Sequence, residues 1–193
     1  MPSVSDLRLA LSSHAAKTIP LEAHMRKAAV AAIFRKSERG VDLLLIVRAI
    51  QERDPWSGHM AFPGGRVEAH DPDPLAAAIR ETKEEVDVDL VRSATHLGPL
   101  SHVLAKSHGK PVPLVIVPHV FLLDEPVTLT PDPSEVADTL YVPFDHLLDP
   151  ANRDSMQRKY GGIPLTFACY RFGERILWGL TLQMIDELRG MFT

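Results

Sequence analysis

The two Asp-Pro pairs at residues 71–74 fix the start of a helix more firmly than any other feature of the chain. The Asp73 side chain can accept hydrogen bonds from the first free backbone N–H groups. Pro74 suits the first helical position, because the N–H that it lacks would be unpaired there. Residues 75–86 (LAAAIRETKEEV) then have high helix propensity. The sequence therefore predicts a helix from residue 75 to about residue 86.

Two apolar segments before this helix are typical of a hairpin of strands. Residues 27–35 are short, small and apolar, which suits a strand that is buried on both faces. A turn at residues 37–40, where Gly40 can take a positive φ, leads to a second strand at residues 41–48. A polar loop that contains Gly and Pro is expected between residues 49 and 65.

The rest of the chain mixes strands with short helices. Residues 114–123 indicate a buried strand in which Pro118 requires a bulge or an edge. We also expect a strand at 139–142, a helical turn at 144–148, a hairpin of 165–170 with 175–178, and a helix at 180–188. This order predicts an α/β (α+β) domain with a mixed sheet over residues 25–193. Residues 1–24 are expected to form an N-terminal helix or arm that ends near Pro20.

Composition and charge exclude several classes of protein. The 193 residues are 45% hydrophobic and 24% charged, as in an ordinary globular domain. The formal net charge of −4 gives no basic surplus for nucleic acid. The longest apolar run has seven residues, whereas a membrane span needs about 20. One cysteine, Cys169, can make no internal disulfide. We therefore expect a soluble, cytoplasmic protein with neither a nucleic acid nor a membrane as partner.

Three glutamates share one face of the predicted helix. Glu81, Glu84 and Glu85 stand at positions i, i+3 and i+4, which are neighbours on a helix surface. Hard cations such as Mg²⁺ bind carboxylate oxygens and complete their shell with water and substrate phosphates. The alternative is a solvated run of charge. The pair Gly64-Gly65, which lets the backbone approach a ligand or metal closely, favours a site.

These residues resemble the signature of the Nudix hydrolase family. That signature runs Gly, five residues, Glu, seven residues, then Arg-Glu-apolar-any-Glu-Glu-any-Gly-apolar. Here Gly65 is followed after five residues by Asp71, and after eight more by the segment RETKEEVDV that begins at Arg80. The chain thus departs in four places: Asp71 replaces Glu, one residue is inserted, Thr82 fills an apolar position, and Asp87 replaces the late glycine. Aspartate tolerates a positive φ there better than most residues.

The first two departures match the coenzyme A pyrophosphatase branch of this family. The likeness extends upstream through Arg48, Arg53 and Gly58 to the segment FPGG at residues 62–65. Arg53 to Gly58 is one residue longer than in that branch. Downstream, the likeness includes the Trp-Gly pair at residues 178–179. The resemblance implies a Nudix α/β/α sandwich with a mixed β-sheet between helices.

The resemblance also implies roles for the acidic residues. Glu81, Glu84 and Glu85 would be catalytic and would bind Mg²⁺ or Mn²⁺, which neutralises the diphosphate and activates water. Arg80 would orient these glutamates. Glu135, on a loop before a late strand, would serve as a base or an extra ligand; the alternative is an ordinary exposed glutamate.

A second set of residues would bind the substrate. Arg48 and Arg53 would grip phosphates with their planar guanidinium groups, and Gly64 and Gly65 would bring the backbone close. Arg48 could instead lie at a strand end in water. We interpret Trp178 and Phe172 as core or dimer contacts rather than as platforms for a nucleobase.

The implied reaction is hydrolysis of coenzyme A or acyl-coenzyme A to 3′,5′-ADP and a 4′-phosphopantetheine product. One alternative is another nucleoside-diphosphate derivative, such as a dinucleotide, a sugar nucleotide or a CDP-alcohol. The other is a Nudix domain that binds a nucleotide without catalysis. Relatives often dimerise, so a homodimer is a possible assembly.

Overall fold

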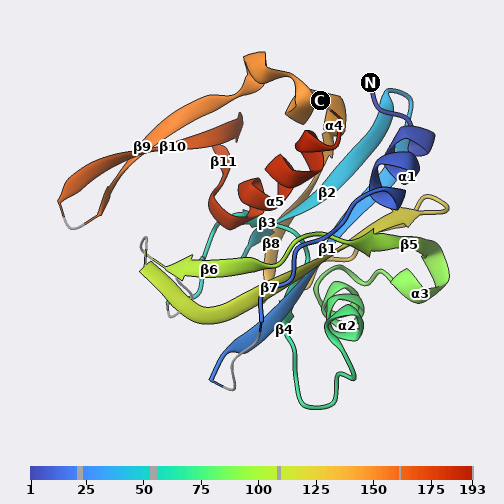
Figure 1. Cartoon of the computed structure of the whole chain (residues 1–193), viewed down its shortest axis with the longest axis horizontal. Coiled ribbons are helices and arrows are strands. Elements are labelled where there is room, and N and C mark those ends of the chain that lie inside the picture. The colour runs from blue at the N-terminus through green and yellow to red at the C-terminus, as the bar shows by residue number, and fades with distance from the viewer. Residues whose placement is uncertain (21–23, 53–55, 108–109, 161, 193) are drawn as a thin grey trace.

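The computed structural model describes residues 1–20, 24–52, 56–107, 110–160 and 162–192. Its main feature is a mixed sheet of eight strands (Figure 1). The strands are β1 (Arg26–Ser37), β2 (Gly40–Arg48), β3 (Met60–Ala61), β4 (Gly64–Arg66), β5 (Ala94–Pro99), β6 (Val103–Ser107), β7 (Lys110–Leu123) and β8 (Val136–Pro143). Strands β1 and β7 run parallel, and the other pairs are antiparallel. The predicted fold class is therefore confirmed.

Helices cover both faces of this sheet because β1 buries side chains on both sides. Ala28, Ala32 and Phe34 pack into a core with α1 (Val4–Ser12), α4 (Phe144–Leu148) and α5 (Gly179–Gly190). The alternate residues Ala29, Ala31 and Ile33 pack into a second core with α2 (Pro74–Val86) and α3 (Leu90–Ser93). Two cores separated by one sheet are the α/β/α arrangement that the resemblance implied.

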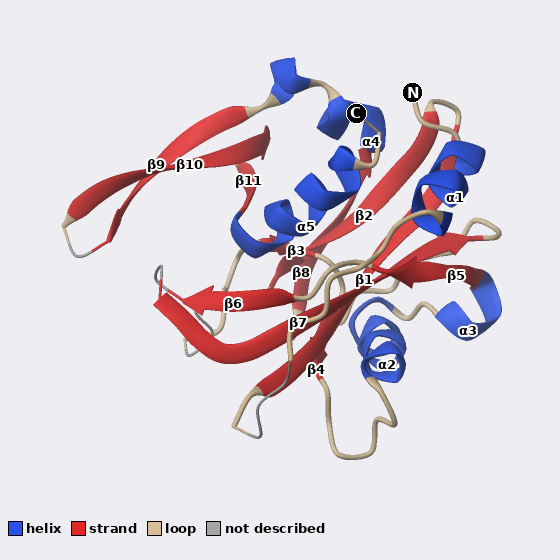
Figure 2. Ribbon diagram, in the orientation of Figure 1, coloured by secondary structure: helices blue, strands red, loops and turns tan. Residues whose placement is uncertain are grey.

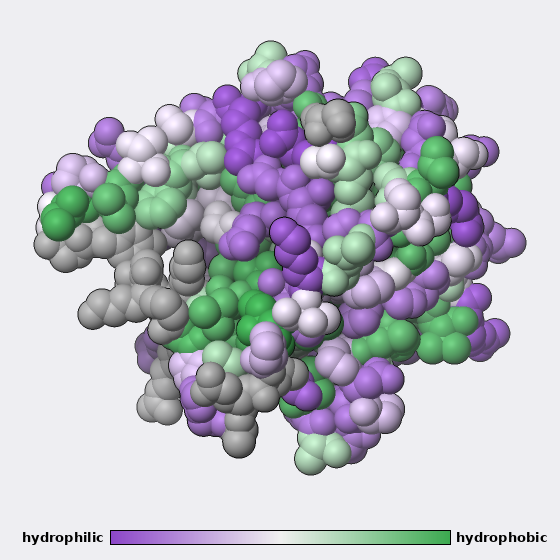
Figure 3. Space-filling model, in the orientation of Figure 1, coloured by the Kyte–Doolittle hydropathy of each residue, from purple (hydrophilic) through white to green (hydrophobic). Residues whose placement is uncertain are grey.

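A three-stranded sheet stands beside the main one. It consists of β9 (Asp154–Tyr160), β10 (Ile163–Phe172) and β11 (Arg175–Trp178), preceded by the short helix η1 (Pro150–Asn152). The β9–β10 hairpin projects away from the body of the molecule (Figure 2). Apolar side chains gather over β6, below this hairpin, in the space-filling view (Figure 3). The predicted hairpin of residues 165–170 and 175–178 is confirmed, while β9 was not predicted.

Strands β1 and β2 diverge beside the segment that contains the glycine pair Gly64-Gly65. β1 pairs with β2 only over residues 34–37, and with the short strand β4 over residues 28–30. The other short strand, β3, pairs with β2 at Ile46 and Val47. The prediction of a loop across residues 49–65 was therefore wrong for β3 and β4. Strands of two and three residues are too short to carry a periodic pattern from which they could be recognised.

Pro118 occupies an interruption in the sheet rather than its edge. Its strand, β7, pairs with β1 on one side and with β5 and then β6 on the other. The Pro118 carbonyl accepts a hydrogen bond of 2.9 Å from the Leu100 N–H, between the end of β5 and the start of β6. The missing proline N–H therefore falls where neither strand continues the ladder, and register shifts in both strands flank this position.

Helix α2 has the predicted start and an unusual end. The Asp73 side chain caps it by accepting from the Ala76 N–H, at 2.8 Å, and Pro74 is its first residue. The buried Thr82 satisfies its hydroxyl with the Ala78 carbonyl at 2.7 Å, which explains its tolerance at an apolar position. The helix ends at Asp87, whose φ of 59° makes it the one non-glycine residue with positive φ in the described parts of the chain.

The N-terminal segment forms a helix that joins the main core. Its helix, α1, begins with a capping box between Ser3 and Asp6 and buries Leu7 and Leu11 against the sheet. Helices α4 and α5 also lie in the segments where the sequence predicts a helical turn and a helix. In the described residues, no helix combines the length and apolar character that a membrane crossing demands.

Replacing Asp87 should test the cost of its left-handed backbone. We expect Asp87→Gly to raise the free energy of unfolding by about 0.5 kcal/mol and Asp87→Ala to lower it by about 1 kcal/mol, because only glycine adopts this φ without a Cβ clash. Denaturant unfolding measures both. The control is Lys83→Ala, which removes the exposed ion pair with Asp87 and should change little. The account would be contradicted if Asp87→Ala were more stable than Asp87→Gly.

Candidate active site

A cavity of about 670 Å³ opens where β1 and β2 diverge. Six of the residues that the sequence analysis selected line it: Arg48, Gly64, Gly65, Glu81, Glu85 and Glu135. They come from the end of β2, strand β4, helix α2 and the loop before β8. Segments far apart in the sequence thus meet at one place. Arg53, also selected, lies outside the described residues.

Glu85 is a buried carboxylate that is tied to the glycine pair. Only 2% of the residue is exposed, and its Oε2 accepts a hydrogen bond of 2.7 Å from the Gly64 N–H. Burial raises the pKa of Glu85 to about 8, although the Gly64 hydrogen bond and the positive charge of Arg48 oppose this rise. Burial therefore disfavours the charged form of Glu85 more than Gly64 and Arg48 favour it.

The two glycines are required by different neighbours. A Cβ atom on Gly64, whose φ is +145°, would lie 2.2 Å from the Ala29 carbonyl oxygen. A Cβ atom on Gly65 would lie 2.4 Å from the Glu81 carboxylate. Gly64 thus allows β4 to lie against β1, and Gly65 makes room for Glu81. The sequence analysis predicted that these glycines would let the backbone approach a ligand or metal. In the structure, the backbone approaches the Ala29 carbonyl and the Glu81 carboxylate.

Glu81 lies beside the same cavity, with 13% of its side chain exposed. Burial raises its pKa, and the nearby Arg80 opposes the rise. The Arg80 Nη1 lies 3.1 Å from the Glu81 Oε1. Glu81 and Glu85 are therefore two desolvated carboxylates on the cavity wall. The charges of Glu84 and Glu135 also raise the pKa of Glu81, and those of Glu81 and Glu135 raise the pKa of Glu85.

Arg80 connects the acidic residues of this region. Its Nε and Nη2 donate to the two Asp71 carboxylate oxygens at 3.1 and 3.0 Å, and its Nη2 also donates to the Arg66 carbonyl at 3.0 Å. The hydrogen bonds from Arg80 lower the pKa of Asp71 to about 2. The Arg80 Nη1 donates to Glu84 at 2.7 Å. Asp71 thus anchors Arg80, and Arg80 orients Glu81 and Glu84.

Glu84 differs in position from the other two glutamates. Its side chain is 53% exposed, and it is paired with Arg80 rather than lining the cavity. Within the described ranges, no three His, Cys, Asp or Glu side chains lie close enough together to hold a metal ion. The predicted trio is therefore divided: Glu81 and Glu85 line the cavity, and Glu84 is not among the residues that line it.

Glu135 and Arg48 approach the cavity from neighbouring segments. The Glu135 carbonyl accepts a hydrogen bond of 2.8 Å from the Ala49 N–H, which ties the loop before β8 to the end of β2. Both side chains line the cavity. The loop position predicted for Glu135 is confirmed, and its carboxylate lies near enough to raise the pKa values of Glu81 and Glu85.

Trp178 lies at a position that the sequence analysis did not predict. It lines the cavity, together with His59 and Trp56, and its ring centroid lies 5.1 Å from that of His59. The interpretation of Trp178 as a core or dimer contact missed this position, because the register of β11 beside β10 decides which way its side chain points. The Trp-Gly pair at residues 178–179 was the sequence feature that could have indicated this position.

The chain belongs to the Nudix family. A family model described as the NUDIX domain matches residues 24–160. The uncharacterized Nudix hydrolase NudL of Photorhabdus laumondii is 30% identical over 155 residues, which cover 75% of this chain and 74% of that protein. The prediction of the Nudix family is thus confirmed.

Other relatives and structures add to this comparison. The human mitochondrial coenzyme A diphosphatase NUDT8 is 30% identical over 156 residues, covering 78% of this chain and 63% of that protein. Across the relatives of highest similarity, the matched region spans between 36% and 74% of their own length. The NUDIX domain of Shewanella oneidensis NrtR, solved with ADP ribose, superposes with a TM-score of 0.58 at 16% identity, over 96% of this chain and 97% of that one. That likeness shows a shared fold.

The two glycines should respond differently to alanine. Gly64→Ala should lower the free energy of unfolding by about 3 kcal/mol, since the new Cβ meets fixed backbone and the φ is strained. Gly65→Ala should cost less than about 1 kcal/mol, because the Glu81 side chain can move, but should reduce hydrolysis of a nucleoside-diphosphate substrate at least tenfold. Denaturant unfolding measures the first effect, and chromatographic detection of the two phosphomonoester products measures the second. Equal effects of both variants on stability would contradict these separate roles.

Proposed function

We propose that this protein is a divalent-metal-dependent pyrophosphohydrolase whose substrate is coenzyme A or an acyl-coenzyme A. The observation that carries the proposal is the convergence of the buried Glu85 carboxylate and the partly buried Glu81 carboxylate on Gly64 and Gly65, at the wall of a cavity that Arg48 also lines. The products would be 3′,5′-ADP and a 4′-phosphopantetheine moiety.

The residues present fit a hard divalent cation. Glu85 is almost fully buried, and burial disfavours its charged form and raises its pKa to about 8, so a cation bound there would stabilise the carboxylate. Carboxylate oxygens are the ligands that Mg²⁺ and Mn²⁺ prefer. Glu81 and Glu85 would hold the ion together with Glu84, which lies one helical turn from Glu81 and would turn from Arg80. When bound, such an ion neutralises diphosphate charge and acidifies water.

The protein's own groups would perform the remaining tasks. Arg48 would pair with phosphate oxygens, since a guanidinium group suits bidentate contact with phosphate. Arg53 would do the same from the segment upstream of the glycine pair. Arg80, anchored by Asp71, would keep the glutamates oriented. Glu135 would accept the proton that the attacking water loses, because its carboxylate lines the same cavity.

The substrate class is supported by named relatives. Human and mouse proteins that are each 30% identical to this chain are named mitochondrial coenzyme A diphosphatases. The aspartate at position 71 and the longer spacing to Arg80 agree with the same branch. Coenzyme A combines a diphosphate with a further phosphate on its ribose, so a site with several arginines suits it.

A substrate panel tests the proposal. With Mg²⁺ or Mn²⁺, coenzyme A should be hydrolysed with the highest kcat/KM among coenzyme A, NADH, ADP-ribose, CDP-choline and a dinucleoside polyphosphate. Chromatography should detect 3′,5′-ADP. EDTA should abolish the reaction, and an excess of either cation should restore it. Hydrolysis that resists the chelator would exclude the metal, and preference for another compound would exclude coenzyme A as the main substrate.

Glu85→Gln tests the buried carboxylate separately. The glutamine oxygen can still accept the Gly64 hydrogen bond, so the fold should be retained, but turnover should fall at least about 100-fold because the anionic ligand is lost. Steady-state kinetics and thermal unfolding measure the two properties. The matched control is Glu125→Gln, at an exposed glutamate outside the cavity. Near-normal turnover of the Glu85 variant would refute its assignment as a ligand.

A further inference from the structure

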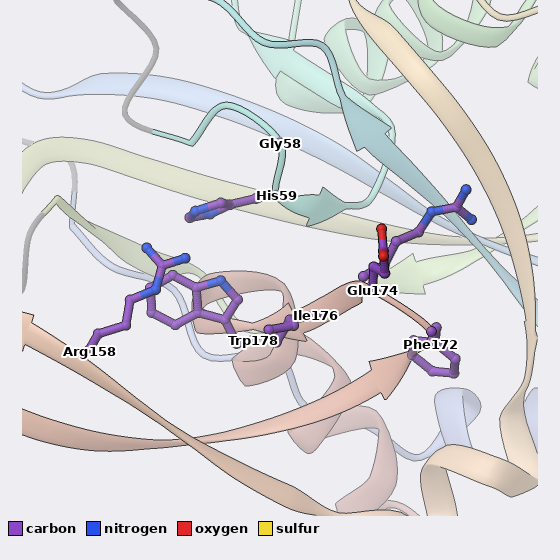
Figure 4. A pocket seen from close by; sticks show the side chains of 9 residues that line it. Gly58, His59, Arg158, Phe172, Glu174, Ile176 and Trp178 are labelled. Carbon is purple, nitrogen blue, oxygen red and sulfur yellow. The ribbon is translucent and has the colours of Figure 1, made fainter.

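A second cavity, of about 520 Å³, adjoins the candidate active site (Figure 4). His59 and Trp178 line both cavities, so the two spaces meet at these side chains. The remaining lining of the second cavity comes from Gly58, from Arg158 on β9, and from the turn between β10 and β11 with the strand ends that flank it. A substrate held at Glu81 and Glu85 could therefore extend past Trp178 toward the projecting hairpin.

Arg158 is held in place by an aromatic ring. Its guanidinium carbon lies 4.4 Å from the centroid of the Trp178 ring, and Figure 4 shows the guanidinium group over the indole, near His59. Stacking of this kind orients the group while leaving its N–H donors available to a ligand. Within the described parts of the chain, no carboxylate forms an ion pair with Arg158.

The other charged residues of this cavity lie elsewhere in it. Arg175 is paired with Asp138. Glu174 lies at the opposite end of the pocket from Arg158 in Figure 4. At the end of the cavity nearest the candidate active site, the positive charge is therefore that of the Arg158 guanidinium group. Trp178 orients this group, beside the polar ring of His59.

We propose that Arg158 and Trp178 form a subsite for a phosphomonoester attached to the same ribose as the diphosphate, such as the 3′-phosphate of coenzyme A. This inference rests on the proposed function and extends it to a residue that determines specificity. A phosphomonoester dianion pairs strongly with a pre-oriented guanidinium group, whereas a free hydroxyl at the same position does not. Arg158 would therefore distinguish substrates that carry this phosphate from those that lack it.

The test compares two ligand pairs in the wild-type protein and in Arg158→Ala. The first pair is coenzyme A and 3′-dephospho-coenzyme A, compared by kcat/KM. The second pair is 3′,5′-ADP and 5′-AMP, compared by isothermal titration calorimetry, which needs no turnover. We expect the wild-type protein to favour the 3′-phosphorylated member of each pair by about tenfold, and the variant to show nearly equal values.

Lys159→Ala is the matched control. Lys159 follows Arg158 on β9, so its side chain points to the opposite face of the hairpin, and its loss removes the same charge. This variant should keep both preferences. Thermal unfolding of both variants should match the wild-type protein, because Arg158 and Lys159 are exposed.

The outcomes separate this inference from the proposed function. If Arg158→Ala keeps the calorimetric preference, or lowers kcat/KM equally for both members of the substrate pair, the subsite is refuted even if coenzyme A is hydrolysed. A wild-type protein with no preference for 3′,5′-ADP refutes it as well. If the calorimetric preference depends on Arg158 but coenzyme A is not hydrolysed, the subsite stands and the proposed function fails.

Discussion

The hydrogen bond from the Gly64 N–H to the Glu85 carboxylate holds strand β4 against helix α2, and the candidate site is arranged around it. A buried carboxylate is costly unless polar groups satisfy it, so this contact fixes the distance between helix and strand. The same distance brings Glu81 against Gly65, where any side chain would collide with it. The divergence of β1 and β2 creates the space in which β4 can lie.

Charge is distributed unevenly across the site. Arg80 is directed toward Asp71 and Glu84, and the pKa of Asp71 is accordingly lowered to about 2. Burial raises the pKa of Glu85 to about 8, although the positive charge of Arg48 opposes this rise. Asp71 and Glu84 are thus compensated by Arg80, whereas burial opposes the charged forms of Glu81 and Glu85 on the cavity wall. That imbalance is the physical basis for expecting a cation there.

The C-terminal part of the chain completes the cavity. The NUDIX family model matches residues 24–160, whereas Trp178, Leu180, Thr181 and Met184 on the cavity wall lie beyond that segment. The acidic residues of the wall lie within the matched segment, as do Trp56 and His59, whereas β11 supplies Trp178 and α5 supplies the other three residues.

The sequence alone determined the elements whose signals are local. Asp73 and Pro74 start α2, the spacing of its glutamates places them on one face, and the apolar run of β1 requires burial on both sides, since caps and periodicity act over a few residues. Only the tertiary structure decided that Glu84 pairs with Arg80 while Glu81 and Glu85 face the cavity, that β3 and β4 fill a divergence in the sheet, and that Trp178 and Arg158 meet. These outcomes depend on strand register and on contacts between segments far apart in the chain, which no local pattern encodes.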